Sequence, residues 1–136
     1  MAALSEEQQM IKDQASAWVR EQAPVSTFRA MRDQGLAQGF FTETWQAMID
    51  MGWTGLVVPE PYGGAGLGYQ TLGLVLEQLG RNLVASPLYA SSVVGAAALL
   101  KSGSEASLGR SDRFPASFRP KIGHFVDAGM ASGKLT

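Results

Sequence analysis

A run of glycines between Tyr62 and Gly68 could bind a phosphate, because successive backbone amides in such a loop can surround an anion. The spacing does not support this chemistry. A Walker loop needs a lysine and then Ser or Thr after its last glycine, and Gly68 is followed by Tyr69-Gln70-Thr71. A dinucleotide fingerprint needs its third glycine two residues further on, with a strand in front. Because Pro59 and Pro61 restrict the backbone beside the glycines, a turn of defined shape is the favoured interpretation.

Single reactive side chains are few. His124 is the one histidine, and only Asp127 stands near it, whereas a catalytic or metal-binding histidine needs an orienting carboxylate or further ligands. Glu60 lies between two prolines, where a solvated or hydrogen-bonded structural role is favoured over catalysis. The chain has no cysteine, which excludes thiolate zinc sites and a thiol nucleophile. We therefore predict no catalytic residue and no metal site.

Length and composition indicate one globular domain. The chain has 136 residues, 46% of them apolar and 17% charged, and a formal net charge of −1. A nucleic-acid-binding protein would carry a basic excess, so no nucleic-acid partner is expected. The N-terminus turns polar at Ser5, unlike a secretory signal, and the longest apolar stretch, Leu88 to Leu100, is too short for a membrane span of about 20 residues. We expect no membrane association and a cytoplasmic location.

The helical pattern begins near the N-terminus of the chain. Ser5 and Gln8 match a capping box, and the first helix should end before Pro24. A shorter helix is predicted over 26–36, with Phe28 and Met31 as its apolar contacts. A third helix is predicted from a cap at Thr42 to Gly52, a position that suits a left-handed C-terminal residue.

Two further helices should follow the glycine-rich loop. In the first, Glu77 and Arg81 can pair one turn apart, and Gly80 suits its end. Ser86-Pro87 is a start signal for a helix over 88–101, which is apolar on nearly every side and is expected to be buried. The fold class is therefore all-α, a helical bundle, followed by an irregular tail interrupted by Pro115 and Pro120.

The run from Gly52 to Gly66 resembles the acyl-CoA dehydrogenase pattern lG-l-G-l-v-P-e-e-y-G-G-a-G. The segment Leu76-Glu77-Gln78-Leu79-Gly80-Arg81 resembles the family's leeLGr, and Ala85-Ser86-Pro87-Leu88 follows in the same order. The resemblance covers about residues 4–106. It implies a helical N-terminal domain over 1–106 and a divergent tail over 107–136.

The family's enzymes bind FAD and desaturate an acyl-CoA thioester between its α and β carbons. Their catalytic base and most flavin contacts lie in a middle β-domain and a C-terminal bundle, whose motifs are absent here. The resemblance therefore implies an N-terminal fragment of such an enzyme, inactive alone and not expected to retain FAD. Aligned through Gly95 and Gly103, it suggests Ala90, Ser91 and Val94 as one wall of the acyl pocket, although small residues there could equally serve close helix packing.

The sequence departs from the family pattern after Ala106, which suggests a disrupted reading frame or a broken gene. Two alternatives to an enzyme fragment stay open. One is a non-catalytic module that docks on a partner dehydrogenase subunit in a homo- or hetero-oligomer. The other is a gene remnant without function.

Overall fold

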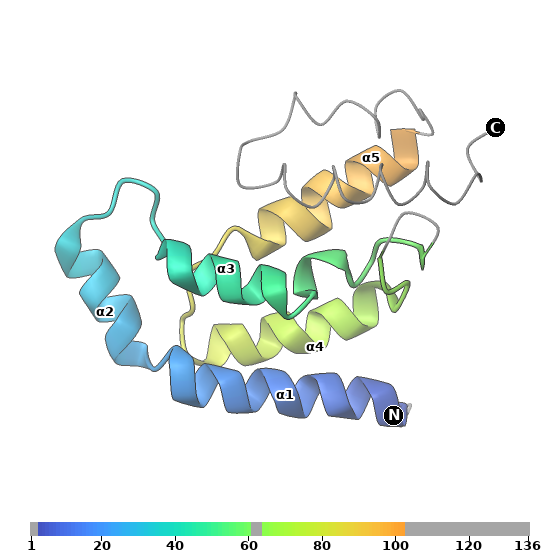
Figure 1. Cartoon of the computed structure of the whole chain (residues 1–136), viewed down its shortest axis with the longest axis horizontal. Coiled ribbons are helices and arrows are strands. Elements are labelled where there is room, and N and C mark those ends of the chain that lie inside the picture. Colours follow the sequence, from blue (N-terminus) through green and yellow to red (C-terminus); the bar gives the residue numbers. More distant parts are fainter. Residues whose placement is uncertain (1–2, 61–63, 103–136) are drawn as a thin grey trace.

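The computed structural model describes residues 3–60 and 64–102, and every regular element in these segments is a helix (Figure 1). This confirms the all-α class for the described part. The predicted tail, with His124, lies outside the described residues. The elements in chain order are α1 (Glu6–Gln22), α2 (Val25–Gln34), α3 (Thr42–Asp50), η1 (Trp53–Gly55), α4 (Gly68–Arg81), η3 (Tyr89–Gly95) and α5 (Ala96–Ser102).

Side chains form hydrogen bonds with the backbone at both ends of helix α1. The Ser5 hydroxyl accepts from the Gln8 amide at 3.1 Å, and the Gln8 side chain accepts from the Ser5 amide at 3.1 Å, which confirms the predicted capping box. At the other end the Asn82 side chain donates to the carbonyls of Val19 and Ala23, both at 3.3 Å. The Val19 carbonyl also accepts the Ala23 amide at 3.2 Å, so the Asn82 side chain adds a second donor there and joins the turn after α4 to the end of α1.

The core lies around α4. Helices α1 and α4 run side by side, and α3 and η1 lie beyond α4 (Figure 1). The Trp18 and Trp53 rings meet edge to face, with centroids 5.4 Å apart at an interplanar angle of 83°. The core cluster consists of Ala15, Val19, Trp45, Met48, Ile49, Trp53, Leu56, Val57, Val58, Leu72, Val75, Leu79, Leu88 and Ala96.

Two helix ends differ from the prediction. Helix α3 already includes Thr42, and Phe41 takes the cap position without a side-chain hydrogen bond, so the predicted Thr42 cap is wrong by one residue. Helix α4 continues through Gly80 to Arg81, and the left-handed residue after it is Leu83, with φ of 55°. The reason is that the turn closes on two α4 carbonyls: Leu83 donates to Gly80, and Val84 donates to Leu79. Gly52, with φ of 78°, is left-handed as predicted.

The predicted helix over 88–101 divides into two segments of different geometry. Tyr89–Gly95 is a π-helix, η3, and Ala96–Ser102 is the α-helix α5. Leu88, Ser92 and Ala96 are buried, but Tyr89 is 60% exposed and Val94 is 56% exposed. The expectation of a helix enclosed by protein is therefore wrong for one face of η3.

Candidate functional site

Three consecutive backbone amides in the described part of the glycine-rich loop donate to carbonyls of the same domain. Ala65 donates to Gly55 at 3.0 Å, Gly66 to Val58 at 2.9 Å and Leu67 to Leu56 at 2.8 Å. These bonds join the loop to Gly55 at the end of η1 and to the segment that follows it. Because these three amides are already paired, they are not available to surround a phosphate.

Gly64 lies where no side chain fits. A Cβ added there would lie 1.9 Å from the Val58 carbonyl oxygen and 2.5 Å from the Val58 Cβ. Real Cβ atoms do not approach this closely, so the backbone of this loop can pack against Val58 only with glycine. The motif is therefore structural: it covers the buried residues Leu56, Val57 and Val58.

No acid–base centre forms among the described residues. Glu60 is exposed. Glu77 accepts a 2.6 Å hydrogen bond from Arg81, which confirms the predicted pair. That hydrogen bond, together with the Arg81 charge, lowers the pKa of the Glu77 carboxyl below its ordinary value, which is the pattern of a solvated ion pair and not of a proton-transferring group. Residues 3–60 and 64–102 contain no group of three or more His, Cys, Asp or Glu that could hold a metal ion.

The exposed face of η3 is the strongest candidate site. Ala90 is exposed and Val94 is 56% exposed, while Ser91 is half-buried. The Ser91 hydroxyl donates to the Pro87 carbonyl at 2.8 Å, so its hydrogen is used within its own helix. Two of the three residues predicted for a pocket wall thus share an open apolar surface, and Ser91 lies at its edge.

Tyr89 belongs to the same face, and sequence reasoning missed it. Hydrogen bonds in a π-helix join residues five apart, so Tyr89 lies close to Val94 one turn on, beside Ala90. An α-helical period would have separated the two side chains further around the axis. We define the η3 face as Tyr89, Ala90 and Val94.

The opposite side of η3 is attached to the core. The Ser92 side chain is 1% exposed, and its hydroxyl donates to the Thr54 carbonyl of η1 at 3.3 Å. Short π-helical turns recur at functional sites because they re-aim side chains within an otherwise regular helix. Here the buried Ser92 and the exposed η3 face lie on opposite sides of the same turn.

The described part of the glycine-rich loop does not fit a flavin pyrophosphate. Its amides at Ala65, Gly66 and Leu67 are paired with backbone carbonyls of the same domain. These three amides are therefore not available to the phosphates of FAD.

A family comparison assigns this helical domain. The chain belongs to the acyl-CoA dehydrogenase family: the model of the acyl-CoA dehydrogenase N-terminal domain matches residues 5–110. The match begins at the predicted capping box and continues a few residues past the expected boundary at 106.

Particular relatives are mycobacterial. The chain is 32% identical over 97 residues to the acyl-CoA dehydrogenase IpdE2 of Mycolicibacterium smegmatis, covering 71% of this chain and 30% of the relative. It is 41% identical over 69 residues to the acyl-CoA dehydrogenase FadE27 of Mycobacterium tuberculosis, covering 51% of this chain and 18% of the relative. No solved structure gives a significant match. The chain thus spans less than a third of the length of these relatives.

Proposed function

We propose that this chain supplies the N-terminal helical part of an FAD-dependent acyl-CoA dehydrogenase that introduces an α,β double bond into an acyl-CoA thioester. The observation that carries the proposal is the family match over residues 5–110. The flavin and the catalytic base are contributed by other parts of the enzyme, and the chain alone is inactive and retains no FAD. The enzyme is proposed to be cytoplasmic. Separately, none of the helices in residues 3–60 and 64–102 has the length and hydropathy of a membrane span.

Within that enzyme, the role of this domain is to form one wall of the acyl pocket. Ala90 and Val94 offer an open apolar surface, and the half-buried Ser91 contributes its Cβ at the edge. Apolar pocket walls bind alkyl groups by removing their surface from water, at about 25 cal/mol per Å². Small side chains at these positions leave room for a sizeable acyl group.

Flavin retention and turnover test the claim that the chain is inactive alone. The purified chain is incubated with excess FAD, desalted and scanned for visible flavin absorption, then assayed for acyl-CoA desaturation with an artificial electron acceptor. We expect neither bound flavin nor turnover. A flavin that stays with the chain at one-to-one stoichiometry would overturn this part of the proposal.

Complementation tests the pocket wall. The chain is co-expressed with M. smegmatis IpdE2 from which the matching N-terminal segment has been removed, and the copurified complex is assayed. Val94→Trp should then raise the KM for acyl-CoA, because the indole fills the pocket. Met10→Trp is the matched control, since Met10 is also exposed, at 68%, but lies on α1. Equal KM values for the two variants would refute the pocket wall while leaving the family role intact.

A second candidate function is favoured by the same surface. Large exposed apolar side chains often mark a protein interface, and Tyr89 and Val94 are such side chains. In this alternative the chain is a non-catalytic module that docks on a dehydrogenase subunit. Size-exclusion chromatography with light scattering on the chain mixed with the truncated IpdE2 would show a stable complex that Tyr89→Ser weakens and Met10→Ser does not. Copurification without turnover would favour the module, and a chain that stays monomeric in the mixture would exclude it.

A further inference from the structure

Of the four helices α1 to α4, helix α2 buries the fewest side chains. None of its ten residues is buried, whereas α1 buries Ala15 and Val19, and both α3 and α4 bury at least three side chains. Its large apolar residues, Phe28 and Met31, are half-buried and belong neither to the core cluster nor to the residues packed against it. In Figure 1, α2 stands at the end of the bundle and crosses the direction shared by α1, α3 and α4.

Polar contacts do not compensate for the missing burial. Among the described residues, the α2 side chains make one ion pair, Arg32 to Asp33 at 2.8 Å, and it lies within the helix. The helix begins after Pro24 without a side-chain cap and ends at Gly35, with φ of 61°. An isolated helix shorter than about 12–15 residues is marginal in water, so this ten-residue helix depends on its tertiary contacts.

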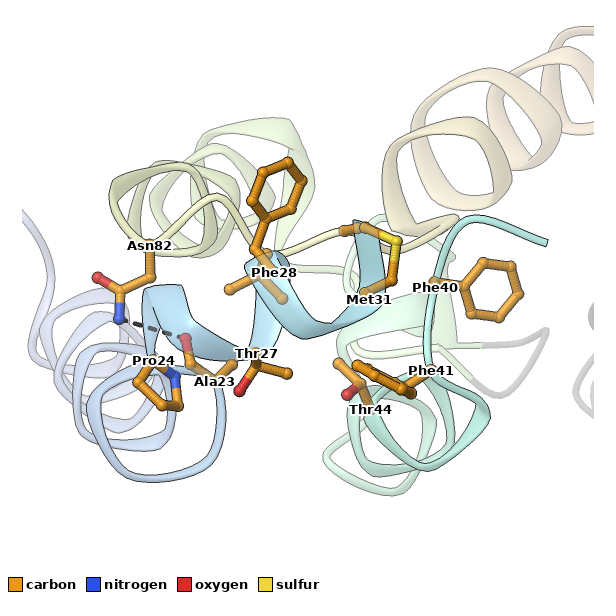
Figure 2. Close-up of a pocket in the computed structure, with 11 residues that line it drawn as sticks. Ala23, Pro24, Thr27, Phe28, Met31, Phe40, Phe41, Thr44 and Asn82 are labelled. Atoms are coloured by element: carbon orange, nitrogen blue, oxygen red, sulfur yellow. Dashed lines mark hydrogen bonds between the residues drawn. The ribbon is translucent and has the colours of Figure 1, made fainter. Parts of the chain in front are cut away.

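Those contacts form an apolar cleft beneath α2 (Figure 2). Phe28 and Met31 of α2 face this cleft together with Phe40 and Phe41 from the connection to α3. The free space is only about 20 Å³, comparable to the volume that one water molecule needs. In the closed structure the cleft therefore has no room for a ligand.

We propose that α2 is a lid that opens as a unit while the α1–α4 core stays folded. The hinges are Pro24 on one side and the segment from Gly35 to Gly39 on the other, where both glycines have positive φ. Opening breaks the half-buried contacts of Phe28 and Met31 and leaves every residue of the core cluster in place. It exposes the aromatic lining of the cleft. This inference is independent of the proposed enzymatic role.

Native-state hydrogen exchange of the whole chain tests the lid. Partial opening lets the α2 amides exchange without global unfolding, so they should exchange at least ~100-fold faster than the central amides of α4, after correction for intrinsic rates. The decisive variant is Val75→Ala, which removes a fully buried side chain of α4. Val75 keeps its contacts in both the closed and the open state, so its loss affects only global unfolding.

In the Val75→Ala chain we expect the α4 amides to exchange roughly ten-fold faster or more, with the α2 amides unchanged within about two-fold. Acceleration of α2 in parallel with α4 would overturn the proposal, because α2 would then open only with the whole domain.

If the Val75→Ala variant does not fold, hydrogen exchange of the unmutated chain at low urea concentrations distinguishes local opening of α2 from global unfolding. Exchange through a small opening depends weakly on urea, whereas exchange through global unfolding depends strongly on it. The α2 amides should show a shallow urea slope and the α4 amides a steep one. Equal slopes from the lowest urea concentration would refute the lid.

Discussion

Replacing Gly64 with alanine tests whether the glycine-rich motif is needed for folding and not for binding. The new Cβ would lie 1.9 Å from the Val58 carbonyl oxygen, and that oxygen already accepts the Gly66 amide at 2.9 Å. The clash involves backbone on both sides, so no side-chain rotation relieves it. The loop must move away from Val58, and the Gly66 hydrogen bond lengthens or breaks.

The cost has two parts. Forcing extra volume into a packed site costs typically about 1–3 kcal/mol, and each lost backbone hydrogen bond adds about 1 kcal/mol. With one or two such bonds lost, the free energy of unfolding should fall by about 2–5 kcal/mol. For a domain of this size the Tm should fall by roughly 10 °C or more.

Urea unfolding followed by tryptophan fluorescence measures this change, because Trp45 and Trp53 are buried in the folded chain. Gly73→Ala is the matched control. Gly73 lies within α4, and a Cβ there meets nothing within 4 Å, so alanine should stabilise the helix by up to about 1 kcal/mol. If Gly64→Ala unfolds within about 0.5 kcal/mol of the unmutated chain, the clash argument is refuted.

Three further outcomes follow from the same structure. Asn82→Ala should lower the free energy of unfolding by about 1–2 kcal/mol, measured in urea, because the hydrogen bonds from the Asn82 side chain to the Val19 and Ala23 carbonyls are lost, although Val19 keeps the Ala23 amide as a donor; an unchanged midpoint would show that water replaces the side-chain amide without cost. Leu83→Gly should stabilise the chain by about 0.5–1 kcal/mol, measured as a higher Tm, because Leu83 is left-handed and 54% exposed; a lower Tm would show that the exposed leucine contributes packing that outweighs its strain. The hydrogen bond from Arg81 lowers the pKa of Glu77 in the folded state, so its stabilising effect is present above the ordinary pKa of 4.5 and is lost as pH falls through the lower folded value. Carboxyl NMR titration should place the Glu77 midpoint below 4.5 in the unmutated chain and nearer 4.5 in Arg81→Ala, and equal midpoints would exclude the ion pair in solution.

Local signals in the sequence predicted the helices well. The Ser5–Gln8 capping box and the Glu77–Arg81 pair depend on residues three or four apart, and both are present as expected. The incorrect predictions concern positions whose backbone conformation depends on tertiary contacts. Gly80 looked like a helix end, but the closing turn is set by carbonyl acceptors on α4, and the left-handed position falls on Leu83.

The candidate site was harder to predict for the same reason. A π-helix has no distinct apolar period in a segment that is apolar on nearly every side, so the sequence predicted a plain α-helix over 88–101. The bond from Ser92 to the Thr54 carbonyl joins residues 38 positions apart. Such a contact carries no local signal, and without it nothing in the pattern indicates that Tyr89 faces solvent.

The glycine-rich loop and the η3 face bear on two different questions. The loop identifies the chain as a family member, and the η3 face is the surface proposed to act in the enzyme. The loop makes the chain recognisable, yet its amides and its glycine at position 64 serve the packing of Leu56 and Val58. The packing of the loop therefore accounts for the glycine at this position without a bound ligand. The η3 face contributes nothing to the core through Tyr89 or Val94, which are both more than half exposed. Folding alone does not require large apolar side chains there, so substitutions on this face test the proposed pocket wall without disturbing the core, whereas substitutions in the motif act on the fold.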